Sequence, residues 1–224
     1  MAELIRGLQP AQVRANIERV RERIAAAAAV AARAPEDVQI LAAVKYVEVE
    51  ELGVLAEAGI ELAGENRAQE LERKVTAYPG RFTWDFIGHL QSRKVKQVLP
   101  LVRYIHSVAS DSVLAQLERH GTPETEVLVE VNVAGDPGKS GILPAELPGL
   151  LERCPVRVVG LMTMPPLATS PEASRPHFGA LRELAGAHRL AELSMGTSQD
   201  YEIAVEEGAT IVRLGSLLYR PGAS

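Results

Sequence analysis

Hydrophobic residues recur along most of the chain in short runs, and segments with a helical period separate these runs. The runs predict buried strands at residues 38–44, 60–63, 83–87, 102–106, 125–133, 156–162, 191–195 and 210–214. The intervening segments have apolar residues three or four positions apart, and they predict helices at 49–58, 69–77, 92–99, 110–120, 144–151, within 171–189 and at 199–207. Regular alternation of strand and helix is typical of parallel strands joined by right-handed crossovers.

The first 35 residues follow a different pattern. Pro10 suits a first helical turn, and the apolar residues after it lie three or four positions apart on one helical face: Val13, Ile17, Val20 and Ile24. An alanine-rich stretch continues this pattern to residue 34, and Pro35 ends it. We therefore predict an N-terminal helix over residues 10–34 that packs on the rest of the protein and carries no chemistry.

The alternation predicts an α/β fold, a single (β/α)8 TIM barrel with this extra N-terminal helix. Eight strand–helix units fit a barrel near the lower end of the usual size. We expect the 224 residues to form one domain, because no linker or low-complexity stretch divides them. A doubly wound open sheet is the alternative. No glycine-rich dinucleotide fingerprint follows the first predicted strand, which argues against the nucleotide-binding form of that fold.

Composition narrows the classes of function. The chain is 46% hydrophobic and 24% charged, and its formal net charge is −5. No strongly basic stripe is present, so we expect no nucleic-acid partner. Cys154 is the one cysteine, which excludes a disulfide within the chain. The longest apolar run, residues 24–32, is too short to span a bilayer and does not have the form of a signal peptide, so we expect a cytoplasmic protein without a membrane segment.

In a barrel of this kind, functional side chains lie at the C-terminal ends of the strands. Lys45 comes directly after residues 38–44, which contain no charged side chain. Partial desolvation lowers the pKa of an amine and makes it a better nucleophile, as a Schiff base requires. The alternative is a lysine whose long side chain simply reaches water, and position alone favours that alternative.

Small and hydroxyl-bearing residues follow the last two predicted strands. Ser194, Gly196 and Ser198 lie at the end of one of them, and Gly215 and Ser216 lie at the end of the other. Phosphate sites in this fold often form from these two loops. Ordinary turns have a similar composition, so the pattern by itself leaves both interpretations open.

Arg213 lies among apolar residues of the last predicted strand, so its permanent charge needs a partner. That partner is either an acid inside the barrel or the ring nitrogen of a cofactor. Weaker candidates are the single histidines His89 and His106, which are as suited to structural hydrogen bonds as to ligand contact. Glu130 and Asn132 share a strand face, and Lys139 lies in a glycine-containing loop. We find no metal-binding motif and no G-x-S-x-G elbow.

At these positions the chain resembles the YggS/PROSC family of pyridoxal phosphate homeostasis proteins over nearly its whole length. Many separate motifs carry the resemblance, in the expected order: residues 41–46 (LAAVKY), 64–70 (GENRAQE), 86–92 (FIGHLQS), 105–108 (IHSV), 131–133 (VNV), 139–142 (KSGI), 160–164 (GLMTM), 193–198 (LSMGTS) and 212–216 (VRLGS). No single motif would suffice.

The resemblance implies the fold of the alanine racemase N-terminal barrel, and pyridoxal 5′-phosphate (PLP) held as a Schiff base on Lys45. It implies phosphate contacts from the loops after the last two strands, a contact of an arginine with the cofactor's ring nitrogen, and an asparagine near the ring. In this chain the matching residues are Ser198, Gly215, Ser216 and Ser194 for the phosphate, Arg213 for the ring nitrogen, and Asn66. Many relatives have Ser or Thr where this chain has Val44, and Met where it has Thr197.

Three functions remain to be compared. They are a PLP-binding homeostasis protein, a racemase-like PLP enzyme, and a barrel for another phosphorylated ligand. A racemase needs acid–base groups on both faces of the substrate carbon. Only nine residues follow Gly215, so we expect no second domain to supply one. An arginine at the ring nitrogen would also make the cofactor a poorer electron sink.

We therefore expect a protein that holds PLP without catalytic turnover. We expect it to be a monomer whose partners are PLP and PLP-dependent apoenzymes. Lys139 is a candidate second amine for the aldehyde.

Overall fold

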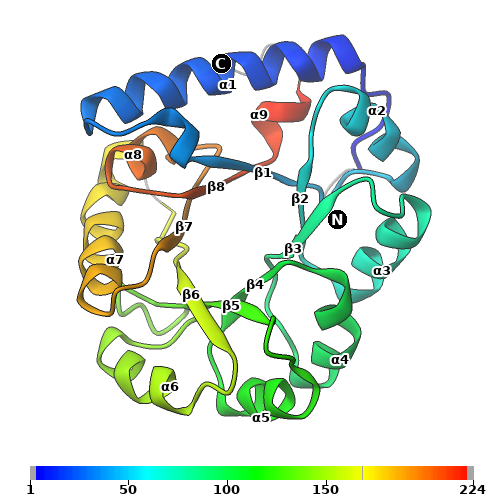
Figure 1. Cartoon of the computed structure of the whole chain (residues 1–224). Coiled ribbons are helices and arrows are strands. Elements are labelled where there is room, and N and C mark those ends of the chain that lie inside the picture. Colours follow the sequence, from blue (N-terminus) through cyan, green and yellow to red (C-terminus); the bar gives the residue numbers. More distant parts are fainter. Residues whose placement is uncertain (1–3, 168, 221–224) are drawn as a thin grey trace.

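The strands of the computed structural model, which describes residues 4–167 and 169–220, close into one barrel (Figure 1). All neighbouring strands are parallel, and β8 pairs with β1 to close the ring. The strands are β1 (Gln39–Ala43), β2 (Leu62–Glu65), β3 (Thr83–Phe86), β4 (Tyr104–Val108), β5 (Glu126–Glu130), β6 (Arg157–Met162), β7 (Glu192–Thr197) and β8 (Ile211–Leu214). The predicted (β/α)8 barrel is confirmed, and the alternative of an open doubly wound sheet is wrong.

Helices surround the barrel and alternate with its strands (Figure 1). They are α1 (Pro10–Val30), α2 (Leu52–Glu57), α3 (Ala68–Ala77), α4 (Val95–Val98), α5 (Asp111–His120), α6 (Leu147–Arg153), α7 (Arg175–Ala187), α8 (Tyr201–Glu206) and α9 (Ser216–Tyr219). Short 3-10 turns precede several of them, as at Val49–Glu51 and Pro171–Ser174. The loops that follow the strands therefore gather at one end of the barrel, which is called the mouth below.

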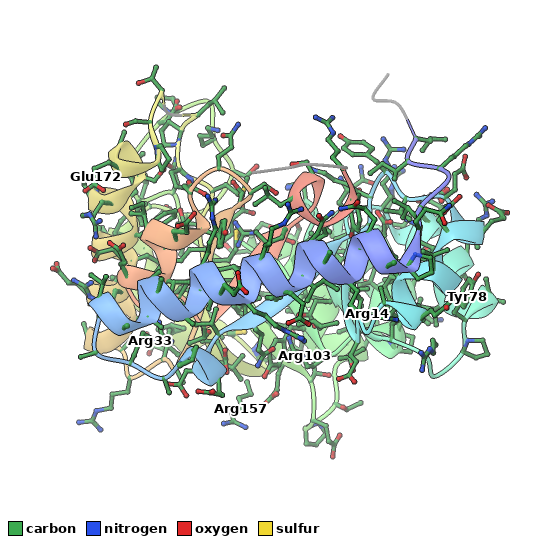
Figure 2. The ribbon with its side chains drawn as sticks, turned by 90° about the horizontal axis from the view of Figure 1, so that it is seen from above. Arg14, Arg33, Tyr78, Arg103, Arg157 and Glu172 are labelled. Atoms are coloured by element: carbon green, nitrogen blue, oxygen red, sulfur yellow. The ribbon has the colours of Figure 1, made fainter. Side chains whose placement is uncertain are left out.

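Helix α1 lies across the outside of the barrel, against α8 and α9 (Figure 2). Its predicted apolar face is buried, with Val13, Ile17, Val20 and Ile24 all in the core. The helix ends at Val30, earlier than the predicted residue 34. The reason is the backbone of Ala32, which has a φ of 52° and turns the chain out of the helix. The amide of Arg33 then donates to Ala28 O at 3.0 Å and closes the helix end.

Helix α9 was not predicted, because four residues are too few to show a helical period. It begins directly after Gly215 and lies between α1 and the paired strands β8 and β1 (Figure 1). Asn16 of α1 is buried, and its Nδ2 donates to Leu218 O at 3.0 Å and to Arg220 O at 3.2 Å. The N-terminal helix therefore fixes the short helix that follows the last strand.

Candidate functional site

The mouth brings together the ends of β7, β8, β1 and β2, which are consecutive in the barrel. Lys45 follows β1 and is exposed, with its Nζ 5.3 Å from the centroid of the Tyr46 ring. Leu41 of β1 lies opposite Arg213 of β8 in the parallel register. An exposed primary amine and a buried guanidinium therefore come from adjacent strands.

The loops after β7 and β8 contact each other. The amide of Gly215 donates to Ser198 Oγ at 3.3 Å. Ser216 is exposed and opens α9, where the first amides of a helix have no intrahelical acceptor. A Cβ placed on Gly215 would lie 3.6 Å from its nearest neighbour, Ala43 O, so internal packing does not require glycine there. The missing side chain leaves space at the mouth.

Gly196 has a different role from Gly215. Its φ is 90°, and a Cβ there would lie 2.6 Å from Ala204 Cβ. Glycine at this position therefore allows β7 to pack against α8, and the residue serves the fold.

Arg213 is 7% exposed, and its hydrogen bonds go to neutral acceptors. Its Nη1 donates to Ser194 O and Ser194 Oγ, both at 2.6 Å, and its Nη2 donates to Thr163 O at 2.9 Å and Met164 Sδ at 2.8 Å. Within residues 4–167 and 169–220, no carboxylate contacts the guanidinium. Burial lowers the pKa of Arg213 to about 10, although the charges of Asp200 and Glu130 oppose this shift. Among the described residues, Arg213 therefore forms no buried ion pair, which was the alternative that the sequence left open.

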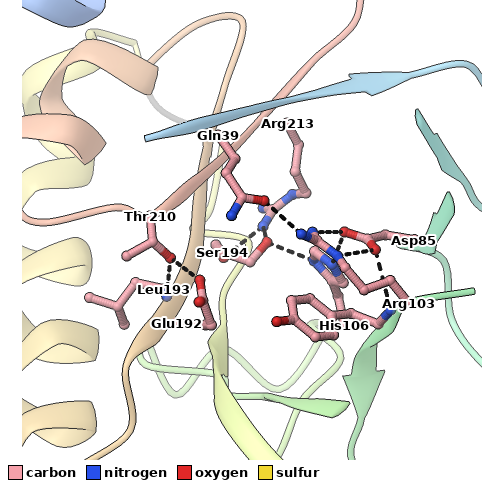
Figure 3. A network of polar contacts seen from close by, with 10 residues as sticks. Gln39, Asp85, Arg103, His106, Glu192, Leu193, Ser194, Thr210 and Arg213 are labelled. Atoms are coloured by element: carbon pink, nitrogen blue, oxygen red, sulfur yellow. Dashed lines mark hydrogen bonds and ion pairs between the residues drawn. The ribbon is translucent and has the colours of Figure 1, made fainter. Parts of the chain in front are cut away.

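A chain of polar contacts crosses the barrel interior from Arg213 to the opposite end (Figure 3). Ser194 Oγ lies 2.8 Å from His106 Nδ1, and His106 Nε2 lies 3.1 Å from Asp85 Oδ2. Arg103 then binds Asp85 through two hydrogen bonds, of 3.1 and 2.7 Å. We call the residues Arg103, Asp85, His106, Ser194 and Arg213 the interior array. The side chains of Asp85, His106 and Ser194 are fully enclosed.

A buried ion pair supports the end of β1. Lys74 of α3 lies 2.5 Å from Glu65 Oε2 and donates to Val44 O at 2.6 Å. Glu65 Oε1 accepts from the amides of Asn66 and Arg67 at 2.6 and 3.2 Å. The pair therefore ties the peptide just before Lys45 to the end of β2.

Sequence comparison identifies the family. The model of the alanine racemase N-terminal domain matches residues 9–221. The pyridoxal phosphate homeostasis protein of Aquifex aeolicus is 40% identical over 218 residues, which cover 91% of this chain and 96% of that protein. The chain belongs to the pyridoxal phosphate homeostasis protein family.

Two solved structures agree with this assignment. An unknown protein from Bifidobacterium adolescentis is 31% identical, with a TM-score of 0.85 and coverage of 97% of this chain and 98% of that one. PipY of Synechococcus elongatus, whose structure contains bound PLP, is 32% identical, with a TM-score of 0.72 and coverage of 90% of this chain and 100% of PipY. The family's fold therefore extends over nearly all of this chain.

Asn66 lies at the end of β2 in this family member, next to the mouth. Its Oδ1 is buried, and within the described part of the chain it has no hydrogen-bond partner. Gly88 allows β3 to end close by, since a Cβ there would lie 2.2 Å from Asn66 O. An unpaired buried oxygen is costly, so Asn66 is suited to a donor that comes from outside the chain.

The weaker candidates lie in different places. His89 is exposed at the mouth, whereas His106 belongs to the interior array. Burial raises the pKa of Glu130, which the charges of Arg213 and His89 oppose. Asn132 Nδ2 donates to Asp136 O at 2.8 Å and so anchors the loop that carries Lys139. Lys139 lines a groove at the mouth together with Met164, Thr197 and Gln199.

None of the helices in residues 4–167 and 169–220 combines the length and the apolar character that crossing a bilayer would require. The same residues contain no group of three or more acids, histidines or cysteines arranged to hold a metal ion. Cys154 lies between α6 and β6 at the end of the barrel away from the mouth, and burial raises its pKa.

Sequence reasoning missed Asp85, Glu65 and Lys74. A signal for Lys74 was present, because it follows Leu71 by three positions and so lies on the buried face of α3. A signal for Asp85 was also present, since it stands between Trp84 and Phe86 in a short buried strand. In both cases a charged residue at a core position indicated an unseen partner.

Proposed function

We propose that this chain binds PLP as a Schiff base on Lys45 and acts in intracellular PLP (vitamin B6) homeostasis. One observation carries the proposal. Arg213 is a buried arginine without a carboxylate contact among the described residues, and it lies on the strand next to β1, which Lys45 follows. The family relationship supports it, because PipY is 32% identical and its structure contains PLP.

The groups at the mouth fit the chemical groups of PLP. The cofactor supplies an aldehyde that condenses with a primary amine, with loss of water. Lys45 offers an exposed amine at the end of β1. Ser198, Gly215 and Ser216 offer hydroxyls, a backbone amide region at the start of α9 and the open space beside Gly215, which suit a phosphate group.

Arg213 and Asn66 fit the cofactor's ring. The hydrogen bonds of Arg213 all use Nη1 and Nη2, so within the described part of the chain its Nε–H is left for an outside acceptor. An unprotonated pyridine nitrogen is such an acceptor. The unpartnered Oδ1 of Asn66 supports its assignment near the ring.

Ser194 takes a different role from the phosphate contact that the resemblance implies. Its side chain is buried and contacts His106 and Arg213. We therefore assign it to the support of Arg213, and the phosphate to Ser198, Gly215 and Ser216.

The proposed role is to hold and release PLP without catalytic turnover. The names of the relatives as homeostasis proteins agree with this role. We further propose a cytoplasmic monomer that passes PLP to apoenzymes, with Lys139 as a second amine at the mouth. The position of Lys139 in the groove with Met164 and Thr197 supports that assignment.

The test of the proposed function is borohydride reduction of the PLP-loaded protein, followed by peptide mass spectrometry. We expect one reduced PLP adduct, on Lys45, and loss of the yellow colour in Lys45→Ala. Lys96→Ala, which changes an exposed lysine of α4, should keep the adduct on Lys45 and, before reduction, the yellow colour. An adduct on a different lysine would overturn the assignment of Lys45. Absence of any adduct would contradict the Schiff base and leave a barrel for another phosphorylated ligand as the alternative.

A further inference from the structure

The orientation of Arg213 depends on a few neutral acceptors. A guanidinium carries five N–H donors in a rigid plane, so fixing two of its nitrogens fixes the whole group. Ser194 accepts from Nη1 through both its backbone oxygen and its Oγ, each at 2.6 Å. The backbone oxygen is fixed by the strand, but the Ser194 side chain can rotate, so its Oγ contributes a steady contact only if something holds the hydroxyl.

The interior array fixes the direction of that hydroxyl. Asp85 is a carboxylate that accepts from Arg103, and although burial alone would raise its pKa, hydrogen bonds from His106 and Arg103 hold the pKa below its ordinary value. Burial lowers the pKa of His106 below its ordinary value, against the hydrogen bond to Asp85, and this favours the neutral ring. A neutral ring next to a carboxylate places its proton on Nε2, which donates to Asp85.

One consequence follows for Ser194. His106 Nδ1 carries no proton in this tautomer, so it accepts from the Ser194 hydroxyl at 2.8 Å. The hydroxyl proton then faces His106, and the lone pairs of Oγ are left for Arg213. Each hydrogen bond in the series Asp85–His106–Ser194–Arg213 therefore has a defined donor and a defined acceptor.

We infer that Asp85 and His106 are positioning residues for the cofactor, which act through Ser194 to hold the guanidinium of Arg213 against the ring nitrogen of PLP. This inference rests on the proposed function. The array begins at the far end of the barrel, where Arg103 and Gln39 line a groove beside α1, and it ends at the mouth (Figure 3). Residues of β3 and β4 would thereby act on the electronic environment of the cofactor through Ser194 and Arg213.

Replacement of Asp85 by asparagine tests the direction of the array with little change in volume. An amide can donate to His106 Nε2, which would move the ring proton to Nδ1. His106 and Arg213 would then both donate to Ser194 Oγ, and the hydroxyl proton would lose its acceptor. The contact of Arg213 with Ser194 Oγ would be weakened, so its guanidinium would be held less firmly by the remaining contacts, which include Ser194 O and Thr163 O. The side chains of the array would all remain polar.

The experiment compares PLP-loaded wild type with Asp85→Asn, Ser194→Ala and Val127→Ala. We expect a shifted visible absorbance maximum and roughly 10-fold faster loss of PLP in the first two variants, because a hydrogen bond to a charged group is weakened or lost; this fold-change corresponds to about 1.4 kcal/mol. Val127→Ala also removes buried atoms from the barrel, on β5, but leaves the array intact. It should keep the wild-type absorbance maximum, which separates positioning from general loss of stability.

Unchanged spectra and unchanged PLP retention in Asp85→Asn and Ser194→Ala would overturn the inference and leave the array a structural feature of the core. If Asp85→Asn does not fold, Ser194→Ala decides, because it retains the Asp85–His106 pair. Borohydride labelling of the wild type distinguishes a failure of the proposed function from a failure of the positioning role. A wild type without an adduct on Lys45 contradicts the proposed function, whereas a labelled wild type with unaltered variants contradicts only the role of the array.

Discussion

Single buried charges in this protein are supported by partners from distant parts of the sequence. Lys74 and Glu65 are both almost fully buried, and their side chains meet at 2.5 Å. Such a pair adds little net stability compared with a hydrophobic pair, but loss of one partner leaves an uncompensated charge in the core. The pair also holds Val44 O, next to the proposed PLP lysine.

We predict that Lys74→Met destabilises the fold by roughly 3–5 kcal/mol, because it leaves the Glu65 carboxylate buried without a counter-charge. The double variant Lys74→Met/Glu65→Gln should recover a large part of this loss. Its glutamine oxygen can still accept from the amides of Asn66 and Arg67, while the buried negative charge is gone. Urea denaturation of Lys74→Met, Glu65→Gln and the double variant measures the coupling free energy between the two side chains. A double variant whose loss equals the sum of the single losses would show that the two side chains act independently.

The strand-end rule found most residues of the candidate site from sequence. It placed Lys45, Ser198 and Gly215 at one end of a predicted barrel, the family resemblance added Asn66, and the structure brings their strands side by side. It could not find the interior array as a unit. Asp85 and His106 are 21 positions apart, and His106 and Ser194 are 88 apart, so their contacts exist only once the barrel has closed.

At the scale of elements, the end of α1 shows how one residue departs from the pattern around it. Alanine is the best helix former, yet Ala32 adopts a φ of 52°, in the left-handed region. The turn directs Arg33 toward α8, where its Nη1 donates to Ala209 O at 2.9 Å and to Val205 O at 3.3 Å. Tertiary contacts of this kind override the local preference for helix.

We predict that Ala32→Gly stabilises the protein by about 0.5–1 kcal/mol. Glycine adopts the left-handed conformation without the steric cost that a Cβ brings, and this gain exceeds the extra entropy of the unfolded chain. Ala26→Gly is the matched control, since Ala26 is exposed within α1 and should lose about 0.5–1 kcal/mol instead. Thermal unfolding of both variants gives the sign of each change in stability. A lower melting temperature for Ala32→Gly would contradict the explanation given for the end of α1.

The type and order of the elements followed from the sequence, but several boundaries did not. Strands β2 and β4 end two residues later than predicted, at Glu65 and Val108. Charged or polar residues near these strand ends interrupt the apolar runs, so the pattern placed the ends too early. The strands continue because such side chains have partners inside the fold, as Glu65 and His106 do. The opposite error occurred at β5, which ends at Glu130 and continues only as an isolated bridge from Val131 to Ile142.

At the scale of the whole molecule, closure of the barrel makes the first and last strands neighbours. Without the β8–β1 pairing, Lys45 and Arg213 would lie at opposite edges of a sheet. Helix α1 reinforces this seam, because Asn16 binds the carbonyls of α9. The proposed PLP site therefore depends on the complete fold, although each of its residues lies in a short local motif.

The openness of the mouth bears on what a bound cofactor could do. Lys45, Lys139 and Ser216 are exposed, and Tyr46 retains 36% of its surface. Water at a reacting centre weakens the electrostatic advantage that a closed site provides. Arg213 at the ring nitrogen would also keep that nitrogen unprotonated, which weakens the ring as an electron sink. Access from solvent suits the arrival of another amine and the departure of PLP.

We predict no racemisation, transamination or decarboxylation of single L-amino acids by the PLP-loaded protein above the rate of free PLP. Incubation with each amino acid, followed by chiral chromatography and keto-acid detection, measures all three reactions. Free PLP at the same concentration and Lys45→Ala serve as controls for chemistry that does not need the site. Turnover well above free PLP that disappears in Lys45→Ala would instead favour the racemase-like alternative. Release of PLP to the added amine without such products would support the role of holding and exchanging the cofactor.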